Sequence, residues 1–131
     1  WGIWATDERG KNPNSEPFEI PSQGLGCFTC RKDSWLGFNP KFRGFGGEEG
    51  YIHEKYKKHG RTTMCLPFLR WLHRFERPNG TSYPNNLLQR FKNYYIGFTE
   101  LGLPTVELEE HFKDVVTTQN IIDIVKELNI S

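Results

Sequence analysis

A glycine-rich segment, residues 38–50 (FNPKFRGFGGEEG), constrains the fold more than any other part of the chain. Gly46 and Gly47 interrupt any regular element there, because glycine adopts turn conformations freely and weakens helices and strands. A helix is predicted to follow from about Glu48 to His59, with Gly60 positioned to end it. The chain is therefore expected to pass directly from a flexible loop into a helix that opens with two carboxylates.

Apolar spacing elsewhere indicates few strands for the length of the chain. Two strands are a small number for an α/β domain, so the pattern favours an incomplete sheet with flanking helices. The predicted elements are an extended stretch over residues 18–30, a short helix over 31–35, the helix over 48–59 with Ile52 and Tyr56 on its buried face, a strand over 61–67, a helix from Tyr83 or Pro84 to Leu101, and an amphipathic helix over 117–129; residues 1–17 are predicted to be a loop and a linker is expected from Leu103.

Composition limits the classes of partner. The 131 residues suffice for one domain, and a net charge of +1 gives no reason to expect nucleic acid or an anionic membrane as a partner. The sequence has no apolar run near the ~20 residues that span a bilayer. Because it begins with Trp1 rather than Met, we expect an excised, soluble piece whose compartment is undetermined, with the cytoplasm slightly favoured. Cys27, Cys30 and Cys65 are expected to be structural.

The helix start after Gly47 offers one candidate for chemistry. Glu48 and Glu49 lie where a helix N-terminus favours negative charge, so either carboxylate can act as a general base toward a hydroxyl. Gly46 and Gly47 let backbone N–H groups approach a ligand, and Phe45 provides a flat face for a sugar ring. The alternative is an ordinary helix start with acidic first-turn residues.

A second candidate is the aromatic and basic segment of residues 68–75 (FLRWLHRF). His73 is a candidate metal ligand or phosphate contact, and Arg70, Arg74 and Arg77 are candidates for neutralising a diphosphate. The alternative is a basic surface loop whose histidine is solvated or packed in the core.

These segments resemble a known family. Residues 44–49 (GFGGEE) resemble the W-G-G-E-[DN] signature of GT-A fold glycosyltransferases, found in β-1,4-galactosyltransferases and, in variant form, in polypeptide N-acetylgalactosaminyltransferases. Residues 24–35 (GLGCFTCRKDSW) resemble the glycine-rich strand and short helix that precede it, and residues 35–75 resemble bacterial and viral family-2-like glycosyltransferases. The resemblance implies that roughly residues 1–112 are the C-terminal, acceptor-side portion of a GT-A (Rossmann-like, nucleotide-diphospho-sugar transferase) catalytic domain, followed by an amphipathic helix in residues 113–131.

The resemblance also implies roles for single residues. Glu49 falls where inverting members have their acidic base, and Glu48 matches the preceding glutamate, which helps to hold the acceptor. Phe45 stands where the family often has a tryptophan against the sugar, while Gly24 and Gly26 match strand glycines beside the donor sugar. Glutamate replaces the usual Asp or Asn after Gly-Gly-Glu, which leaves inversion or retention of the anomeric centre open.

A divalent cation, Mn²⁺ or Mg²⁺, is implied in the same way. His73 matches the histidine that completes the metal site in many of these enzymes. The family's Asp-x-Asp motif is absent, because none of the four aspartates, Asp7, Asp33, Asp114 and Asp123, has that spacing. The remaining metal ligands are therefore expected outside this chain.

Two functions are compatible with these residues. One is a fragment of a metal-dependent glycosyltransferase that moves a sugar from a nucleoside-diphosphate sugar to a hydroxyl of a carbohydrate or glycoprotein acceptor. Such a fragment is expected to be inactive in isolation and to be able to self-associate through its incomplete sheet. The alternative is a non-catalytic carbohydrate-binding or scaffold module, in which Trp1, Trp4, Phe45 and Trp71 stack on sugars without catalysis.

Overall fold

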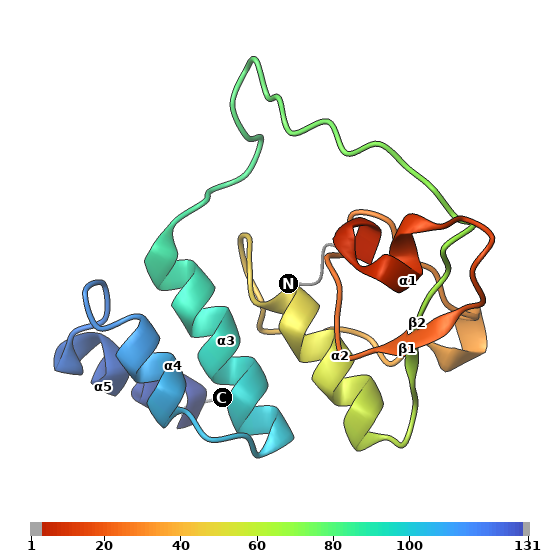
Figure 1. The fold of residues 1–131 in the computed structure, drawn as a ribbon. Coiled ribbons are helices and arrows are strands. Elements are labelled where there is room, and N and C mark those ends of the chain that lie inside the picture. Colours follow the sequence, from red (N-terminus) through yellow and green to blue (C-terminus); the bar gives the residue numbers. More distant parts are fainter. Residues whose placement is uncertain (1–3, 130–131) are drawn as a thin grey trace.

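The structure is a computed structural model that describes residues 4–129, a small domain of helices with one two-stranded sheet (Figure 1). Trp1, considered above as a sugar-stacking residue, lies outside the described residues. None of the helices in the described part is long and apolar enough to cross a membrane. In chain order the elements are the 3-10 helix η1 (Trp4–Thr6), α1 (Glu8–Lys11), β1 (Phe18–Ile20), the 3-10 helix η2 (Lys32–Ser34), α2 (Glu48–Lys58), β2 (Thr63–Cys65), α3 (Leu87–Leu101), α4 (Val106–His111) and α5 (Thr118–Asn129).

The sheet pairs β1 with β2 in antiparallel orientation, and Glu19 lies opposite Met64. Both predicted strands therefore exist, although the extended stretch of residues 18–30 is a strand only over its first three residues. Pro21 follows directly, and a proline has no backbone N–H to contribute to a strand ladder. The mixed helix and strand content fits the expected α/β class at this coarse level.

Helices α2 and α3 lie side by side and form the first part of the core (Figure 1). Ile52 and Tyr56 are buried on the face of α2 predicted for them, together with Tyr51 and Leu101. Gly97 makes this approach possible, because a Cβ atom at this position would lie 2.9 Å from the ring of Tyr51. The absence of a side chain in the middle of α3 thus lets the two helices pack closely.

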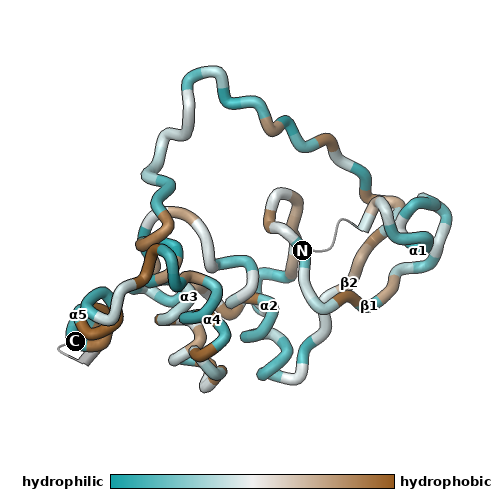
Figure 2. The backbone as a smooth tube through the Cα atoms, turned by 60° about the vertical axis from the view of Figure 1, so that its left-hand side comes forward, coloured by the Kyte–Doolittle hydropathy of each residue, from teal (hydrophilic) through white to brown (hydrophobic). Residues whose placement is uncertain are grey.

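A second cluster joins α3 to the two C-terminal helices. Its buried members are Phe91, Leu108, Phe112, Val116 and Ile124. Figure 2 shows hydrophobic stretches along α3 and α5, whereas much of α2 is hydrophilic in sequence. The predicted C-terminal helix is confirmed within one residue, and its apolar positions supply Ile124 to this core.

Three sequence predictions need correction. The loop predicted for residues 1–17 contains η1 and α1, and Asp7 caps α1 by accepting a hydrogen bond from the amide of Arg9. The helix predicted from Tyr83 or Pro84 starts at Leu87, because the Asn86 side chain caps it through the Gln89 amide. The linker expected after Leu103 includes α4.

A hydrogen-bonded cluster ties α2, α3 and the loop before α2 around the carboxylate of Glu100. The Tyr51 hydroxyl lies 2.9 and 2.8 Å from its two oxygens, Asn39 donates to it at 2.7 Å, and the Lys55 ammonium lies 3.4 Å away. Partial burial acts to raise the pKa of Glu100, but the hydrogen bonds from Asn39 and Tyr51 and the charge of Lys55 outweigh it. The pKa therefore lies below its ordinary value of 4.5.

This lowered pKa sets the sign of a pH effect on folding. The carboxylate stabilises the fold above pH 4.5, and that contribution is lost as the pH falls through the lower, folded-state pKa. We expect Glu100→Gln to be less stable than the wild type at pH 7 and the two unfolding free energies to converge in acid. Urea unfolding between pH 7 and pH 3 measures this. Glu16→Gln, a substitution at an exposed loop position, should show the same pH dependence of the unfolding free energy as the wild type. A difference in unfolding free energy between Glu100→Gln and the wild type that stays constant with pH would contradict the assignment.

Candidate functional site

The site begins where the glycine-rich loop enters α2. Gly47 precedes the helix with φ at 94°, a left-handed conformation that favours glycine, and Glu48 and Glu49 occupy the first helical turn as predicted. Against the backbone of α3, a Cβ atom at Gly47 would lie 3.2 Å from the amide nitrogen of Tyr94. The glycine is thus needed both for the turn and for the close contact with α3.

The carboxylate of Glu49 reaches the glycine-rich stretch before the short helix η2. Its Oε1 accepts a hydrogen bond of 2.9 Å from the backbone N–H of Leu25. A Cβ atom at Gly24 would lie 3.5 Å from the same oxygen, an ordinary van der Waals distance, so the carboxylate lies directly beside the Gly24 backbone. Two segments that the sequence analysis singled out separately therefore meet at one carboxylate.

Trp71 and His73 lie over the next glycine of this stretch. A Cβ atom at Gly26 would lie 2.3 Å from Cη2 of Trp71 and 3.4 Å from Cδ2 of His73. The rings of Trp71 and His73 are 5.1 Å apart. Gly24, Gly26, Glu49, Trp71 and His73 are thus gathered along the Gly24–Gly26 stretch, and we call this group the glycine-strip site.

A pair of glycine substitutions tests this arrangement. In Gly26→Ala the new methyl group would overlap the Trp71 ring, so the indole must move, whereas in Gly24→Ala it meets only an ordinary contact with Glu49. We expect the indole N–H resonance of Trp71 to change its chemical shift in Gly26→Ala and to remain close to the wild-type value in Gly24→Ala, with both proteins folded. An unchanged Trp71 signal in Gly26→Ala would mean that the ring is not seated on the glycine.

Phe45 lies apart from the glycine-strip site. Its ring stacks on Tyr83 with centroids 5.1 Å apart, and the guanidinium of Arg90 lies 5.7 Å from the ring centre. Arg90 also packs on Gly46, where a Cβ atom would lie 2.6 Å from its Cγ. One face of the predicted sugar platform is therefore covered by another aromatic ring.

The basic residues predicted to contact a diphosphate lie in different surroundings. Arg70 donates from Nη2 to the carbonyls of Gly10 and Lys11 at 3.0 and 2.7 Å, so it fastens its segment to α1. Arg74 is exposed on the segment that leads to α3. Glu48 is partly exposed beside Glu49 at the start of α2.

Among the described residues, two histidines at or near this site have a buried ring nitrogen without a hydrogen-bond partner: His73 through Nδ1 and His53 through Nε2. Nδ1 of His73 is buried and has no hydrogen-bond partner among the described residues, and the ring stacks on Phe75 at 3.9 Å. Within residues 4–129, no three His, Cys, Asp or Glu side chains are grouped to hold an ion. The chemistry of a buried imidazole nitrogen at His73 is compatible with one metal-ligand position.

Two residues near the site were missed by the sequence analysis. Asn93 on α3 is 2% exposed and its side chain bonds the loop before α2 through Arg43 and Gly46. His53, also 2% exposed, bonds the Glu49 carbonyl through Nδ1 at 2.6 Å. The signal for Asn93 was a side-chain amide between the aromatic residues Phe91 and Tyr94 of a helix, and His53 follows Glu49 by one helical turn.

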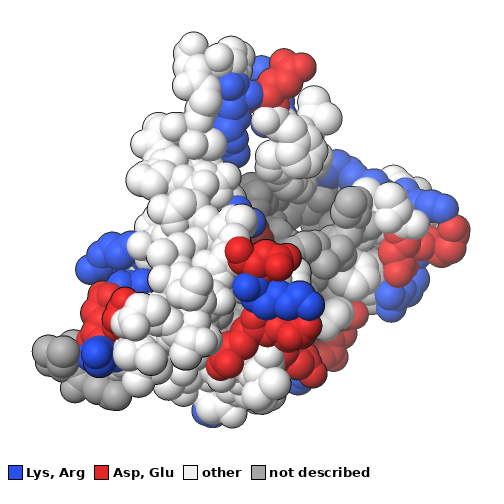
Figure 3. All heavy atoms as spheres, turned by 90° about the vertical axis from the view of Figure 1, so that its left-hand side faces the viewer, with Lys and Arg blue, Asp and Glu red and all other residues white. Residues whose placement is uncertain are grey.

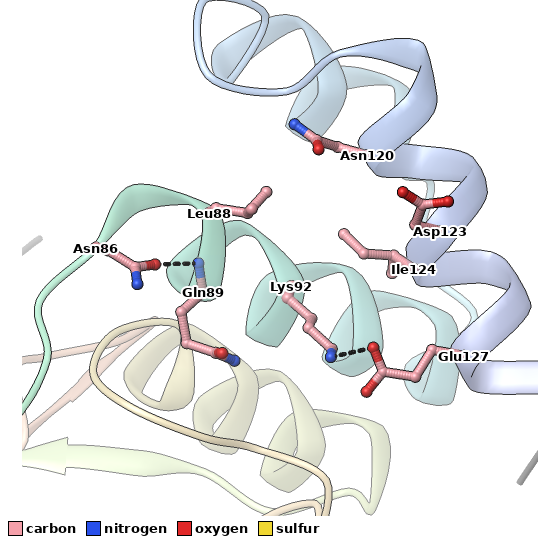
Figure 4. A pocket seen from close by; sticks show the side chains of 8 residues that line it. All are labelled: Asn86, Leu88, Gln89, Lys92, Asn120, Asp123, Ile124 and Glu127. Carbon is pink, nitrogen blue, oxygen red and sulfur yellow. Dashed lines mark hydrogen bonds and ion pairs between the residues drawn. The ribbon is translucent and has the colours of Figure 1, made fainter.

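Two hollows of the described structure lie away from this site. One of about 280 Å³ separates α3 from α5 and is lined by Asn86, Leu88, Gln89, Lys92, Asn120, Asp123, Ile124 and Glu127 (Figure 4). Another of about 220 Å³ lies between α3 and α4. Figure 3 shows acidic and basic groups interspersed over the α3–α5 side of the molecule, with no field of a single sign. Neither hollow includes a residue of the glycine-strip site.

Comparisons with protein-family models, curated proteins and solved structures found no match to this chain.

Proposed function

We propose that this chain is the acceptor side of a metal-dependent glycosyltransferase, with Glu49 as the general base. The observation that carries the proposal is the hydrogen bond between Glu49 and the Leu25 amide. It fixes a carboxylate beside the Gly24 backbone, at the edge of a glycine stretch on which Trp71 is seated at Gly26. A carboxylate, an open backbone and an aromatic ring are what the placement and activation of a sugar hydroxyl require.

The proposed reaction needs one proton acceptor on this side. The acceptor hydroxyl oxygen attacks the anomeric carbon of the donor sugar while its proton passes to Glu49. The bond from that carbon to the nucleoside diphosphate breaks, and the diphosphate leaves with the electron pair. Oε1 of Glu49 is held by Leu25, which leaves Oε2 to receive the proton.

For the metal, the donor chemistry of His73 fits one position. An imidazole nitrogen that is buried without a partner is a suitable ligand for Mn²⁺, and the ring is held in place by Phe75. A divalent ion bound there neutralises charge on the departing diphosphate. We propose that a nucleotide sugar is the donor and that the other ligands come from outside residues 4–129.

A non-catalytic carbohydrate-binding module is the second candidate. It is favoured because Glu49 lines neither hollow and because the side chain of Trp71 is half exposed. In that case Trp71 would bind sugar, while Glu49 would only fasten the glycine stretch to α2.

Metal dependence in the complete protein that contains this chain tests the proposal. We expect it to transfer sugar from a nucleotide sugar only with a divalent ion, and His73→Ala to raise the ion concentration at half-maximal activity by about tenfold or more, the usual range for weakening a metal site. Titration with Mn²⁺ measures this. His59→Ala, which alters an exposed histidine at the end of α2, is the control. If the ion concentration at half-maximal activity were unchanged in His73→Ala, His73 would not be a metal ligand.

A further inference from the structure

The segment between β2 and α3 concentrates the exposed apolar side chains of the molecule. It forms an open arch, along which hydrophobic and hydrophilic positions alternate (Figures 1 and 2). We call residues 68–77 the aromatic arm. Exposed apolar surface of this density marks an interaction site in a folded protein. The exposed side chains are Phe68 (62%), Leu69 (49%), Trp71 (51%), Leu72 (82%) and Phe75 (79%).

The first part of the arm has a fixed position. Arg70 is bonded to the two carbonyls of α1, and Trp71 rests on Gly26. Because Gly24, two residues away, adjoins the Glu49 carboxylate, the Trp71 ring and that carboxylate are held along the same short stretch. A ligand on the arm would therefore extend toward Glu49.

Alternate residues of the arm share a side. The rings of Trp71 and His73 are 5.1 Å apart, and those of His73 and Phe75 are 3.9 Å apart with an angle of 21° between their planes. This is the spacing expected of an extended chain, in which residues two apart point the same way. Three rings thus form a row that leads away from the glycine-strip site, with Phe75 at its exposed end.

The arm also has a net positive charge. It holds Arg70, Arg74 and Arg77 against one acidic residue, Glu76, and so has a net charge of +2, whereas the whole chain has +1 and the remainder therefore −1. Arg70 is committed to α1, but Arg74 and Arg77 are exposed and form no ion pair with a described carboxylate. Two free guanidinium groups beside a row of rings match a ligand with both flat apolar faces and anionic groups.

We infer that the aromatic arm binds an oligosaccharide bearing carboxylate or sulfate groups, and that this is the acceptor of the proposed transferase. The inference relies on the proposed function for the direction of the ligand toward Glu49. The rings supply surface for sugar faces, and Arg74 and Arg77 supply charge-assisted hydrogen bonds to the anionic substituents. Single-stranded nucleic acid and anionic membranes fit less well, because two free arginines allow few phosphate contacts.

Binding to the chain itself tests this inference without nucleotide sugar or metal. The probe is a short oligomer of galacturonic acid, and a neutral galactose oligomer of the same length is its reference, both followed by calorimetry. We expect the uronate to bind about tenfold more tightly, as one or two added charge-assisted contacts would give, and to weaken as salt is added. Trp71→Ala should weaken binding of both oligomers.

Charge variants distinguish recognition by the arginines of the arm from attraction of an anionic ligand by the net charge of the protein. Arg74→Gln with Arg77→Gln should remove the preference for the uronate. The matched control, Lys113→Gln with Lys126→Gln, changes the net charge equally at two exposed lysines outside the arm, one after α4 and one on α5, and should retain the preference. Circular dichroism of both double variants should match the wild type.

Several results would overturn the inference. They are equal affinity for the neutral oligomer, no binding of either oligomer, equal loss in the lysine control, or tighter binding of polyuridylate or of phosphatidylserine vesicles than of the uronate. These outcomes concern the arm alone. Transfer to a neutral acceptor by the complete protein, with loss in Glu49 variants, would leave the proposed function standing while the inference failed.

Discussion

Glu49→Gln in the complete protein is expected to lower the turnover number by about 10²–10⁴-fold, the usual contribution of a general base. Glutamine retains the size of the side chain and an oxygen that can accept the hydrogen bond from Leu25. It cannot take a proton from a sugar hydroxyl. The substitution therefore separates the chemical role of the carboxylate from its structural role.

The binding and stability readouts sharpen this test. Affinity for the nucleotide sugar should remain close to that of the wild type, because Glu49 acts on the acceptor. The unfolding free energy should also change little, since the contact to Leu25 is kept. Steady-state kinetics with saturating donor, together with urea unfolding, measure both quantities.

Glu48→Gln is the matched control on the same helical turn. The hydrogen bond from the Leu25 amide goes to Glu49 and not to Glu48, so we expect a smaller loss, mainly in the apparent affinity for the acceptor. Full activity of Glu49→Gln with an inactive Glu48→Gln would move the base by one residue. Full activity of both would reduce the two carboxylates to helix-start residues, and the carbohydrate-binding module would then be the better proposal.

The helices were predictable where their signals are local. The start of α2 follows from Gly47 and the acidic pair, and its end follows from Gly60. The start of α3 was placed too early because Pro84 suits a first helical turn, whereas the Asn86 side chain actually caps the helix. α4 was missed because its six residues are too few for a clear apolar period.

The contacts of the candidate site were not predictable, because they join distant parts of the chain. The sequence identified Gly24 and Glu49 but could not indicate that the carboxylate bonds the Leu25 amide. For the same reason it presented Phe45 as an open platform, while the structure stacks Tyr83 on it. The local sequence indicates which chemical groups a segment carries, but tertiary packing decides which faces of those side chains remain accessible to a ligand.

Asn93 is the other residue for which we expect a large effect, this time on stability. Its Oδ1 accepts from the Arg43 amide at 3.0 Å, and its Nδ2 donates to the carbonyls of Arg43 and Gly46 at 2.7 and 2.9 Å. The side chain is 2% exposed and lies 3.0 Å from the position of a Cβ atom on Gly47. One amide therefore satisfies three backbone groups of the loop that leads into α2.

Asn93→Ala should lower the unfolding free energy by about 2–4 kcal/mol, because each buried backbone group left without a partner costs about 1–3 kcal/mol and the losses are only partly additive. Asn93→Asp should not rescue it, since a carboxylate oxygen would then face the two carbonyls to which the amide donates. Urea unfolding of the chain measures both variants.

The control is Asn120→Ala on α5, which removes one hydrogen bond of 3.3 Å from the side-chain amide to the Val115 carbonyl. We expect it to lower the unfolding free energy by less than about 1 kcal/mol. Hydrogen exchange locates the effect. In Asn93→Ala the Arg43 amide should lose protection beyond the global change, because its acceptor is the deleted oxygen. If Asn93→Ala were as stable as Asn120→Ala, water would replace the amide at little cost. The loop that carries Gly46 and Gly47 into Glu48 and Glu49 would then be held by backbone packing on α3 rather than by this side chain.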